Sequence, residues 1–181
     1  RHLRAHHAPR RGAAEIDEVG RAKETQMSDT VRLERELEFH DQRFSSEERR
    51  KSHRFYSITG RSAEAYRDAV RGVPAGSDLL EIGCGDHAEA WELDERGLDV
   101  TAIDISTVAV AQARDRAIGE GRWRLKFQEM NAEQLELPDS SFDAVIGAGI
   151  LHHLDLDAAI PEVARVLRPD GRFLSYTPAY P

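Results

Sequence analysis

The stretch from Leu79 to His87 constrains the fold of this chain more than any other part of its sequence. An apolar run there is interrupted by Gly83 and Gly85, and a segment with helical propensity follows. Such a run is typical of a short buried strand, and the glycines permit a sharp turn in which a ligand can approach the main chain. The stretch therefore predicts a strand, a tight turn and a helix that begins near Asp86, with its N-terminus facing the turn.

A second signal is an acidic residue at the end of the next apolar run. Asp104 stands 19 residues after Gly85 and closes the run over residues 100–104. A carboxylate in this position can accept hydrogen bonds from both hydroxyls of a ribose. The sequence therefore predicts a nucleoside site at the carboxyl ends of two neighbouring parallel strands.

Strand-like and helix-like segments alternate through the second half of the chain, with short turns between them. This alternation predicts an α/β fold whose parallel sheet is covered on both faces. The expected strands are residues 78–82, 98–103, 123–128, 142–147 and 172–177. The expected helices are residues 62–71, with Ala65, Tyr66, Ala69 and Val70 inward, then 86–97, 106–118 capped by Ser106, and 157–167 capped by Asp157 with Pro161 in its first turn.

The part of the chain before this domain divides into two segments by composition. Residues 1–26 are rich in arginine and histidine, and we expect them to be a disordered extension upstream of a natural start at Met27. Residues 27–73 are highly charged with few apolar anchors. They predict either a solvated helical extension or a lid over the active site. Residues 74–181 then form the α/β domain.

Composition excludes several classes of function. The formal charge of −8 argues against a general nucleic-acid binder, and no apolar run approaches the ~18 residues of a membrane helix. The one cysteine, Cys84, allows no internal disulfide and fits a reducing cytoplasm. We expect the Cys84 side chain to fill the glycine turn rather than act as a nucleophile. We expect no metal site, although the histidines near the N-terminus could bind a metal adventitiously.

Five motifs, taken in order, resemble those of the class I S-adenosylmethionine-dependent methyltransferases that act on small molecules. They are residues 81–85, Asp104, residues 131–143, residues 151–154 and residues 166–171. The resemblance implies a Rossmann-like doubly wound parallel sheet in the order 3-2-1-4-5, normally completed by two further strands. Because the chain stops soon after the fifth expected strand, we expect a methyltransferase domain that is truncated there.

The resemblance also implies a cofactor site for S-adenosylmethionine. Glu81 would lie close to the ammonium group, Asp104 would bind the ribose, and Asn131 would replace the family's usual acid at the adenine, where its amide oxygen accepts a hydrogen bond without charge. The further contacts are Gly83, Cys84, Gly85, Ile105, Ala132, Glu133, Gly147 and Tyr56. Alternatives remain open: Asp104 as a helix cap, Asn131 as a turn former and Tyr56 as a packed aromatic ring. His87 departs from the small residue usual at its position.

His152 and His153 follow the fourth expected strand, where the methyl acceptor should face the sulfonium. Histidine has a pKa suited to removing a proton from a hydroxyl or amine, so the pair predicts a general base or a group that orients the acceptor. The alternative is a structural pair bonded to backbone carbonyls. We expect a cytoplasmic enzyme without nucleic-acid or membrane partners. By resemblance, its acceptor is a hydroxyl of a sugar or a secondary metabolite.

Two other functions fit parts of the sequence. A dinucleotide-dependent oxidoreductase using NAD(P) fits because Gly83, Gly85 and Ala88 match the dinucleotide fingerprint, with an acid about twenty residues further on. That reading leaves the motif at residues 131–143 and the paired histidines unexplained. A module that binds S-adenosylmethionine without catalysing a reaction is the second alternative, favoured by His87 and by the end of the chain after the fifth strand.

Overall fold

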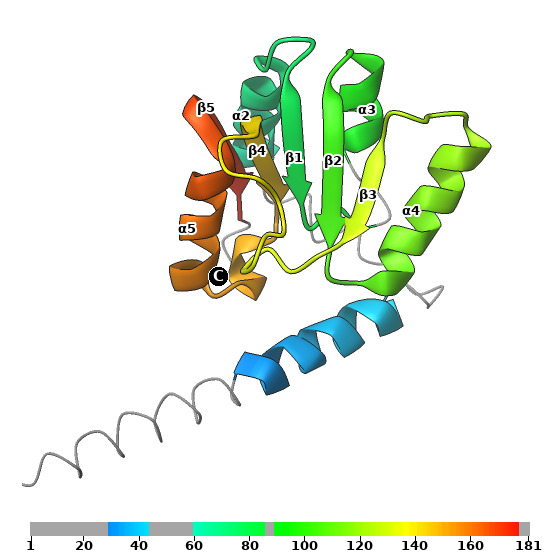
Figure 1. Ribbon diagram of the computed structural model, residues 1–181, viewed down its shortest axis with the longest axis vertical. Helices are drawn as coiled ribbons and strands as arrows, with labels where there is room; N and C mark the ends of the chain where they lie inside the picture. The colour runs from blue at the N-terminus through cyan, green and yellow to red at the C-terminus, as the bar shows by residue number, and fades with distance from the viewer. Residues whose placement is uncertain (1–28, 44–59, 86–88, 178–181) are drawn as a thin grey trace, which may run out of the picture. The chain divides into compact units, whose positions relative to one another are not determined.

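The computed structural model describes residues 29–43, 60–85 and 89–177 of the chain (Figure 1). The chain divides into two compact units, residues 1–36 and residues 37–181. A helix covers residues 29–43, and the second unit begins within it. The sheet and the helices that pack on it belong to the second unit.

The second unit is built on a five-stranded parallel sheet with the strand order β3-β2-β1-β4-β5, as the family resemblance implies. In Figure 1 the arrowheads of β1 and β2 point to the same edge of this sheet, the edge that carries the candidate site. The strands are β1 (Asp78–Ile82), β2 (Asp99–Asp104), β3 (Lys126–Glu129), β4 (Phe142–Ala148) and β5 (Leu167–Tyr176).

Helices cover both faces of the sheet, so each face has its own apolar cluster. After the helix over residues 29–43, the described helical elements are α2 (Gly60–Arg71), α3 (Ala90–Glu95), α4 (Thr107–Gly119), the 3-10 turn η2 (Leu151–His153) and α5 (Leu156–Val166). One cluster packs α2, α3 and α4 against the sheet, through Tyr66, Trp91 and Val110. The other cluster packs α5 against the opposite face, through Val163 and Val166. The doubly wound Rossmann-like fold is therefore confirmed.

The buried face of α2 differs from the expected one. Ala63, Tyr66 and Val70 are buried, whereas Ala65 and Ala69 are exposed. Residues spaced by three and four share one side of a helix, and this spacing joins residues 63, 66 and 70 rather than 65 and 69. The prediction was wrong for the two alanines because a short alanine-rich helix offers more than one plausible apolar stripe.

Two boundaries also differ from the sequence prediction. Trp123 lies outside β3 and is 77% exposed, since the strand begins only at Lys126. Helix α5 is capped by Asp155, whose side chain accepts the backbone N–H of Asp157, and Pro161 lies inside the helix beyond its first turn. Both errors concern the first residue of an element, where turns and side-chain caps decide the boundary as much as helix or strand propensity does.

Strand β5 begins earlier than expected and contains a register shift. Leu167 pairs with Phe142, whereas Arg172 pairs with Ala144, so the residues between them bulge from the ladder. The guanidinium of Arg168 next to this shift donates to Asp143 at 2.6 Å and to Asp78 at 2.7 Å. Its hydrogen bond is the main cause that holds the pKa of Asp143 below its ordinary value. The Arg168 side chain thereby joins β5, β4 and β1 at the edge opposite the candidate site.

A second arginine fixes the polar connection between β3 and β4. Arg165 of α5 donates to the backbone oxygens of Leu135 and Leu137, at 2.7 and 2.8 Å. It also pairs with Glu162 and Asp139. Because charge-assisted hydrogen bonds are stronger than neutral ones, this single side chain holds a segment that has no regular structure of its own.

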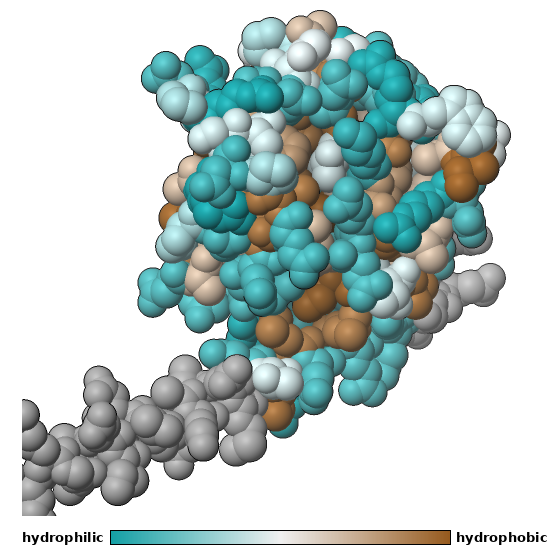
Figure 2. Space-filling model, in the orientation of Figure 1, coloured by the Kyte–Doolittle hydropathy of each residue, from teal (hydrophilic) through white to brown (hydrophobic). Residues whose placement is uncertain are grey.

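The surface carries mixed polar and apolar groups. The face drawn in Figure 2 is largely hydrophilic, with apolar atoms showing between polar side chains. In the described part of the chain, no helix has both the length and the apolar character needed to cross a membrane.

Candidate active site at the carboxyl edge of the sheet

The loop after β1 has the sharp turn that its glycines predict. Gly83 and Gly85 have φ values of +69° and +55°, a region that favours glycine. The Cys84 N–H between them donates to the Ile103 carbonyl of β2 at 3.0 Å, which pins the loop to the neighbouring strand. The turn thus places the main chain of residues 83–85 at the end of the sheet where the sequence predicts a ligand.

The side chains of Ile150 and Ile82 already occupy the space where Gly83 and Gly147 lack a Cβ atom. A Cβ atom at Gly83 would lie 2.7 Å from Cδ1 of Ile150, and a Cβ atom at Gly147 would lie 2.8 Å from both Ile150 and Ile82. The glycines at the ends of β1 and β4 therefore also make room for Ile150. A ligand here would contact the main chain of the loop rather than the positions of the missing Cβ atoms.

Glu81 is a buried acid directly beneath this loop. Its carboxylate accepts the backbone N–H groups of Glu89 at 2.9 Å and Ala90 at 3.0 Å, at the beginning of α3. Helix α3 therefore starts at Ala90, later than expected from the sequence. Burial, the largest effect, raises the pKa of Glu81 from 4.5 to about 8, although these two hydrogen bonds favour the charged form. Glu81 is thus largely protonated at neutral pH, and a nearby cation would favour its ionisation.

A second acid lies near Glu81, and the sequence analysis missed it. Glu89 accepts a hydrogen bond from the Tyr66 hydroxyl at 3.3 Å. Burial raises the pKa of Glu89, and burial together with the Glu89 charge raises the pKa of Tyr66. The sequence carries no signal for this pair, because 23 residues separate Tyr66 from Glu89. Two acids of raised pKa close to the glycine loop form an environment suited to a positively charged ligand group.

Asp104 joins the glycine loop to the end of β2. It is buried, and its carboxylate accepts the Gly85 N–H at 2.8 Å and the Ser106 N–H at 2.9 Å. The N-cap of α4 is Ser106, whose hydroxyl oxygen accepts the Ala109 N–H at 3.1 Å. Asp104 is therefore not the cap of this helix, although it does brace the turn that leads into it. Each carboxylate oxygen can accept more than one hydrogen bond, so both retain the capacity to accept from a diol.

The segment after β3 lies at the same edge. The Met130 N–H donates to the Asp104 carbonyl at 2.9 Å, and the side-chain oxygen of Asn131 accepts the Glu133 N–H at 3.0 Å. Asn131 therefore does form a turn, as one alternative predicted. Glu133 in turn accepts the Asp155 N–H at 2.8 Å, which links this segment to the start of α5. Ala132 between them is buried.

Cys84 and Ile105 complete the described residues that the sequence placed here. Cys84 is buried, and burial raises the pKa of its thiol well above the ordinary value. A neutral buried thiol is a poor nucleophile, which agrees with its interpretation as a filler of the turn. Ile105 follows β2 directly and is partly buried. Tyr56, the remaining predicted contact, lies outside the described residues.

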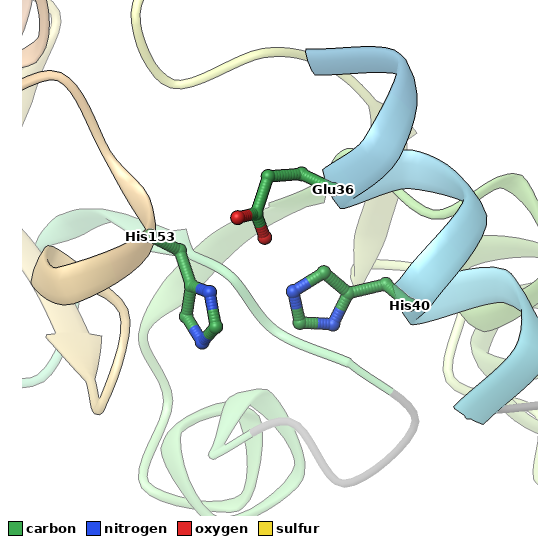
Figure 3. Close-up of side chains that lie close together, drawn as sticks. All are labelled: Glu36, His40 and His153. Atoms are coloured by element: carbon green, nitrogen blue, oxygen red, sulfur yellow. The ribbon is translucent and has the colours of Figure 1, made fainter. Parts of the chain in front are cut away.

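The predicted histidines lie in the 3-10 turn η2, after β4. His152 is exposed and His153 is partly buried, and their ring centroids are 4.0 Å apart. The structure adds a third histidine that the sequence analysis did not consider. The ring of His40, from the helix over residues 29–43, lies 4.9 Å from that of His153 at an interplanar angle of 74° (Figure 3).

The residue after His40 contacts the other side of the site. The Asp41 carboxylate accepts a hydrogen bond from the Ser106 hydroxyl, and it lies 3.4 Å from both the Thr107 hydroxyl and the Val108 nitrogen. Two adjacent residues of one helix therefore reach the loop after β4 and the start of α4. Nothing in the local sequence distinguishes His40 and Asp41 from the other polar residues of this charged helix.

Comparison with known proteins agrees with the geometry of this edge. The family described as methyltransferase domain matches residues 80–175, which includes every described strand except the first two residues of β1 and the last residue of β5. The match thus takes in the glycine loop, Asp104, the segment after β3 and the paired histidines.

Individual relatives match about half of the chain. The 27-O-demethylrifamycin SV methyltransferase of Amycolatopsis mediterranei is 42% identical over 101 residues, which cover 54% of this chain and 37% of that protein. The ubiquinone/menaquinone biosynthesis C-methyltransferase of Brucella canis is 43% identical over 95 residues, covering 51% of this chain and 35% of that protein. The chain thus spans little more than a third of the length of these relatives.

A solved structure shows the same arrangement of elements. The phosphoethanolamine N-methyltransferase 2 of Haemonchus contortus, in complex with S-adenosyl-L-methionine, superposes with a TM-score of 0.58 at 29% identity. The alignment covers 64% of this chain and 27% of that one. Together with the family match and the strand order, this similarity shows that the chain belongs to the class I S-adenosylmethionine-dependent methyltransferases.

Proposed function

We propose that this chain binds S-adenosylmethionine at the carboxyl edge of its sheet and transfers the methyl group to a small-molecule acceptor. The observation that carries the proposal is the 2.8 Å hydrogen bond from the Gly85 N–H to the buried Asp104 carboxylate. It joins the glycine loop and the acid that should bind the ribose into one site at two neighbouring strand ends, where ligands of doubly wound folds bind.

The cofactor would lie across the ends of β1, β2 and β3. We assign its ammonium group to Glu81, directly or through water, and its methionine part to the main chain of residues 83–85. Asp104 and Ile105 would bind the ribose, while residues 131–133 would border the adenine. Gly147, at the end of β4, would border the methyl group, and Tyr56 remains a proposed contact from the segment before α2.

The histidines would serve the acceptor side. Methyl transfer is an in-line displacement: the acceptor atom forms a bond to the methyl carbon as the bond from that carbon to sulfur breaks. Positioning supplies most of the rate, with proximity worth up to ~7–11 kcal/mol. We assign His152 or His153 the role of taking the proton that the acceptor hydroxyl loses. Residues 40 and 41, which contact the loops after β4 and β2, would cover the site as part of a lid.

The acceptor is proposed to be a hydroxyl of a sugar or a secondary metabolite. Support for a hydroxyl comes from the relative that is named for methylation of 27-O-demethylrifamycin SV, and the relative named as a C-methyltransferase of quinone biosynthesis supports only a small-molecule acceptor. Both names describe small organic acceptors. The partly exposed rings of η2 fit an acceptor that approaches from solvent.

The proposal is tested by binding and then by transfer. Calorimetric titration with S-adenosylmethionine is expected to give one site, whereas NAD is expected to give none. Incubation with small-molecule extracts and S-adenosylmethionine should then yield products heavier by one methyl group in mass spectrometry, together with S-adenosylhomocysteine. NAD binding alone would favour an oxidoreductase, and cofactor binding with no product from any extract would favour a module without catalysis.

Cofactor binding is expected to release a proton from Glu81. In the free protein the raised pKa of about 8 keeps this carboxyl mostly protonated at pH 7, and a cofactor ammonium beside it would lower that pKa. Affinity should therefore rise with pH from about 6 to 8 and level off above, with a slope approaching one proton per cofactor bound. Calorimetry at pH 7 in buffers of different ionisation enthalpy measures the released proton directly.

The matched control for this coupling is Glu81→Gln, which keeps the size of the side chain and one acceptor oxygen. The variant should bind the cofactor more weakly and release no proton. In the wild type, the pKa of Glu81 in the folded state is above 4.5, so its contribution to the free energy of unfolding falls as the pH rises from about 4.5 to 8. This pH dependence of stability should be absent from Glu81→Gln. Equal proton release by the wild type and Glu81→Gln would assign the ammonium to another group.

A further inference from the structure

We propose that His40 and His153 form a binding site for a divalent transition-metal ion that prefers imidazole ligands, of which Zn²⁺ is the most common. The site is distinct from the cofactor contacts assigned above, and the inference does not depend on methyl transfer. It rests on two histidines that are far apart in the sequence and that the fold brings together from a helix and a turn.

The geometry of the two rings fits a shared ion. Their ligand nitrogens lie within 4.8 Å of each other, and the ring centroids are 4.9 Å apart. Two imidazoles that bind one tetrahedral zinc at ~2.0–2.1 Å have centroids roughly 5 Å apart. Small side-chain rotations would thus bring both nitrogens onto an ion without moving either backbone.

The orientation of the rings and their burial point the same way. The interplanar angle of 74° excludes a parallel stack, in which the ring faces rather than the nitrogens would meet. Both side chains are partly buried, so a bound ion would be shielded from water on part of its surface and still open to exchange. Neutral imidazole nitrogens suit zinc, copper and nickel better than they suit magnesium or calcium, which prefer oxygen.

Two neighbouring residues define the limits of the site. Figure 3 shows Glu36 on the same helix as His40, four residues earlier, a spacing that places side chains on one helix face. Glu36 belongs to the first compact unit, so we assign the site to His40 and His153 alone. His152 is adjacent to His153 in sequence but is exposed. Among the described residues, it does not belong to the group of side chains whose potential metal-binding atoms lie within 4.8 Å of one another.

An ion here would cross-link residues 37–43, the part of the helix that belongs to the second unit, to the loop after β4. His40 and His153 are 113 positions apart in the sequence, so the ion would join remote parts of the chain. The Asp41 contacts already attach the same part of the helix to the start of α4. A metal bound at His40 and His153 would therefore hold residues 37–43 against the acceptor side of the site.

The test is a calorimetric titration of the whole chain with zinc chloride, in the absence of S-adenosylmethionine. His40→Ala and His153→Ala are each expected to weaken the tightest site by roughly tenfold or more. His152→Ala, which removes a histidine from the same turn, is the matched control and should bind as the wild type does. The other histidines of the chain, His2, His6, His7, His53 and His87, are common to all four proteins, so binding to them cancels in the comparison.

A second measurement guards against loss of folding in the variants. Saturating zinc should raise the melting temperature of the wild type and of His152→Ala, but not that of His40→Ala or His153→Ala, since only a ligand bound to the folded state stabilises it. S-adenosylmethionine affinity, measured separately, should be similar in all four proteins. Zinc affinity that is unchanged in both His40→Ala and His153→Ala, or equally reduced in His152→Ala, would overturn the site while leaving the proposed methyl transfer untouched.

Discussion

Replacing the histidine of η2 that we propose as the general base by alanine is expected to lower kcat by roughly 10²–10⁴-fold while cofactor affinity stays nearly unchanged. The candidates are His152 and His153, which follow β4 where the transferred methyl group should face the acceptor. The loss would fall on kcat because a base is needed only as the acceptor hydroxyl gives up its proton. A loss confined to KM would instead indicate that the histidine orients the acceptor.

Three single variants separate these roles: His152→Ala, His153→Ala and His40→Ala. All are assayed with the acceptor found by the mass-spectrometric screen, in the presence of a metal chelator, so that an ion held by His40 and His153 does not affect the rate. Repeating the assay with added zinc then tests whether the ion inhibits, as it should if His153 is the base and its nitrogen becomes occupied. Rates equal to wild type in both His152→Ala and His153→Ala would reduce the pair to a structural role.

Replacing Asp104 by alanine is expected to weaken S-adenosylmethionine binding by roughly 1–3 kcal/mol, because two ribose hydroxyls lose a charged acceptor. The structure adds a second effect. The Gly85 and Ser106 N–H groups both donate to this buried carboxylate, so the variant also leaves two backbone donors without their present acceptor. The melting temperature should therefore fall together with the affinity, and the glycine loop should become less ordered.

The matched control is Asp99→Ala, at the other end of the same strand. Asp99 is exposed and pairs with Arg124 at 2.9 Å, so its loss should leave cofactor affinity unchanged and cost little stability. Calorimetry gives the affinities, and thermal unfolding with and without cofactor gives the stabilities. Asp104→Ala that binds as tightly as wild type would remove this residue from the cofactor site, whatever its effect on folding.

Much of the sheet could be predicted from the sequence because buried parallel strands carry a strong local signal. The limits of β1 agree with the expected ones, β4 ends one residue later than expected, and β2 begins and ends one residue later. The strand order came from the resemblance to a family, since local patterns do not specify which strands are neighbours. Element ends were less predictable: Trp123 and Asp157 were misassigned because turns and caps depend on hydrogen bonds that propensity does not encode.

The candidate site divides in the same way. The sequence by itself determined the glycine turn, the acid at the end of β2 and the histidines after β4, because each follows a strand and parallel strands end at one edge. Only the tertiary structure decided that Asp104 binds the glycine loop, that burial keeps Glu81 largely protonated, and that His40 meets His153. These three features depend on distances between residues remote in sequence and on the exclusion of water. Neither can be predicted from the residues that are neighbours along the chain.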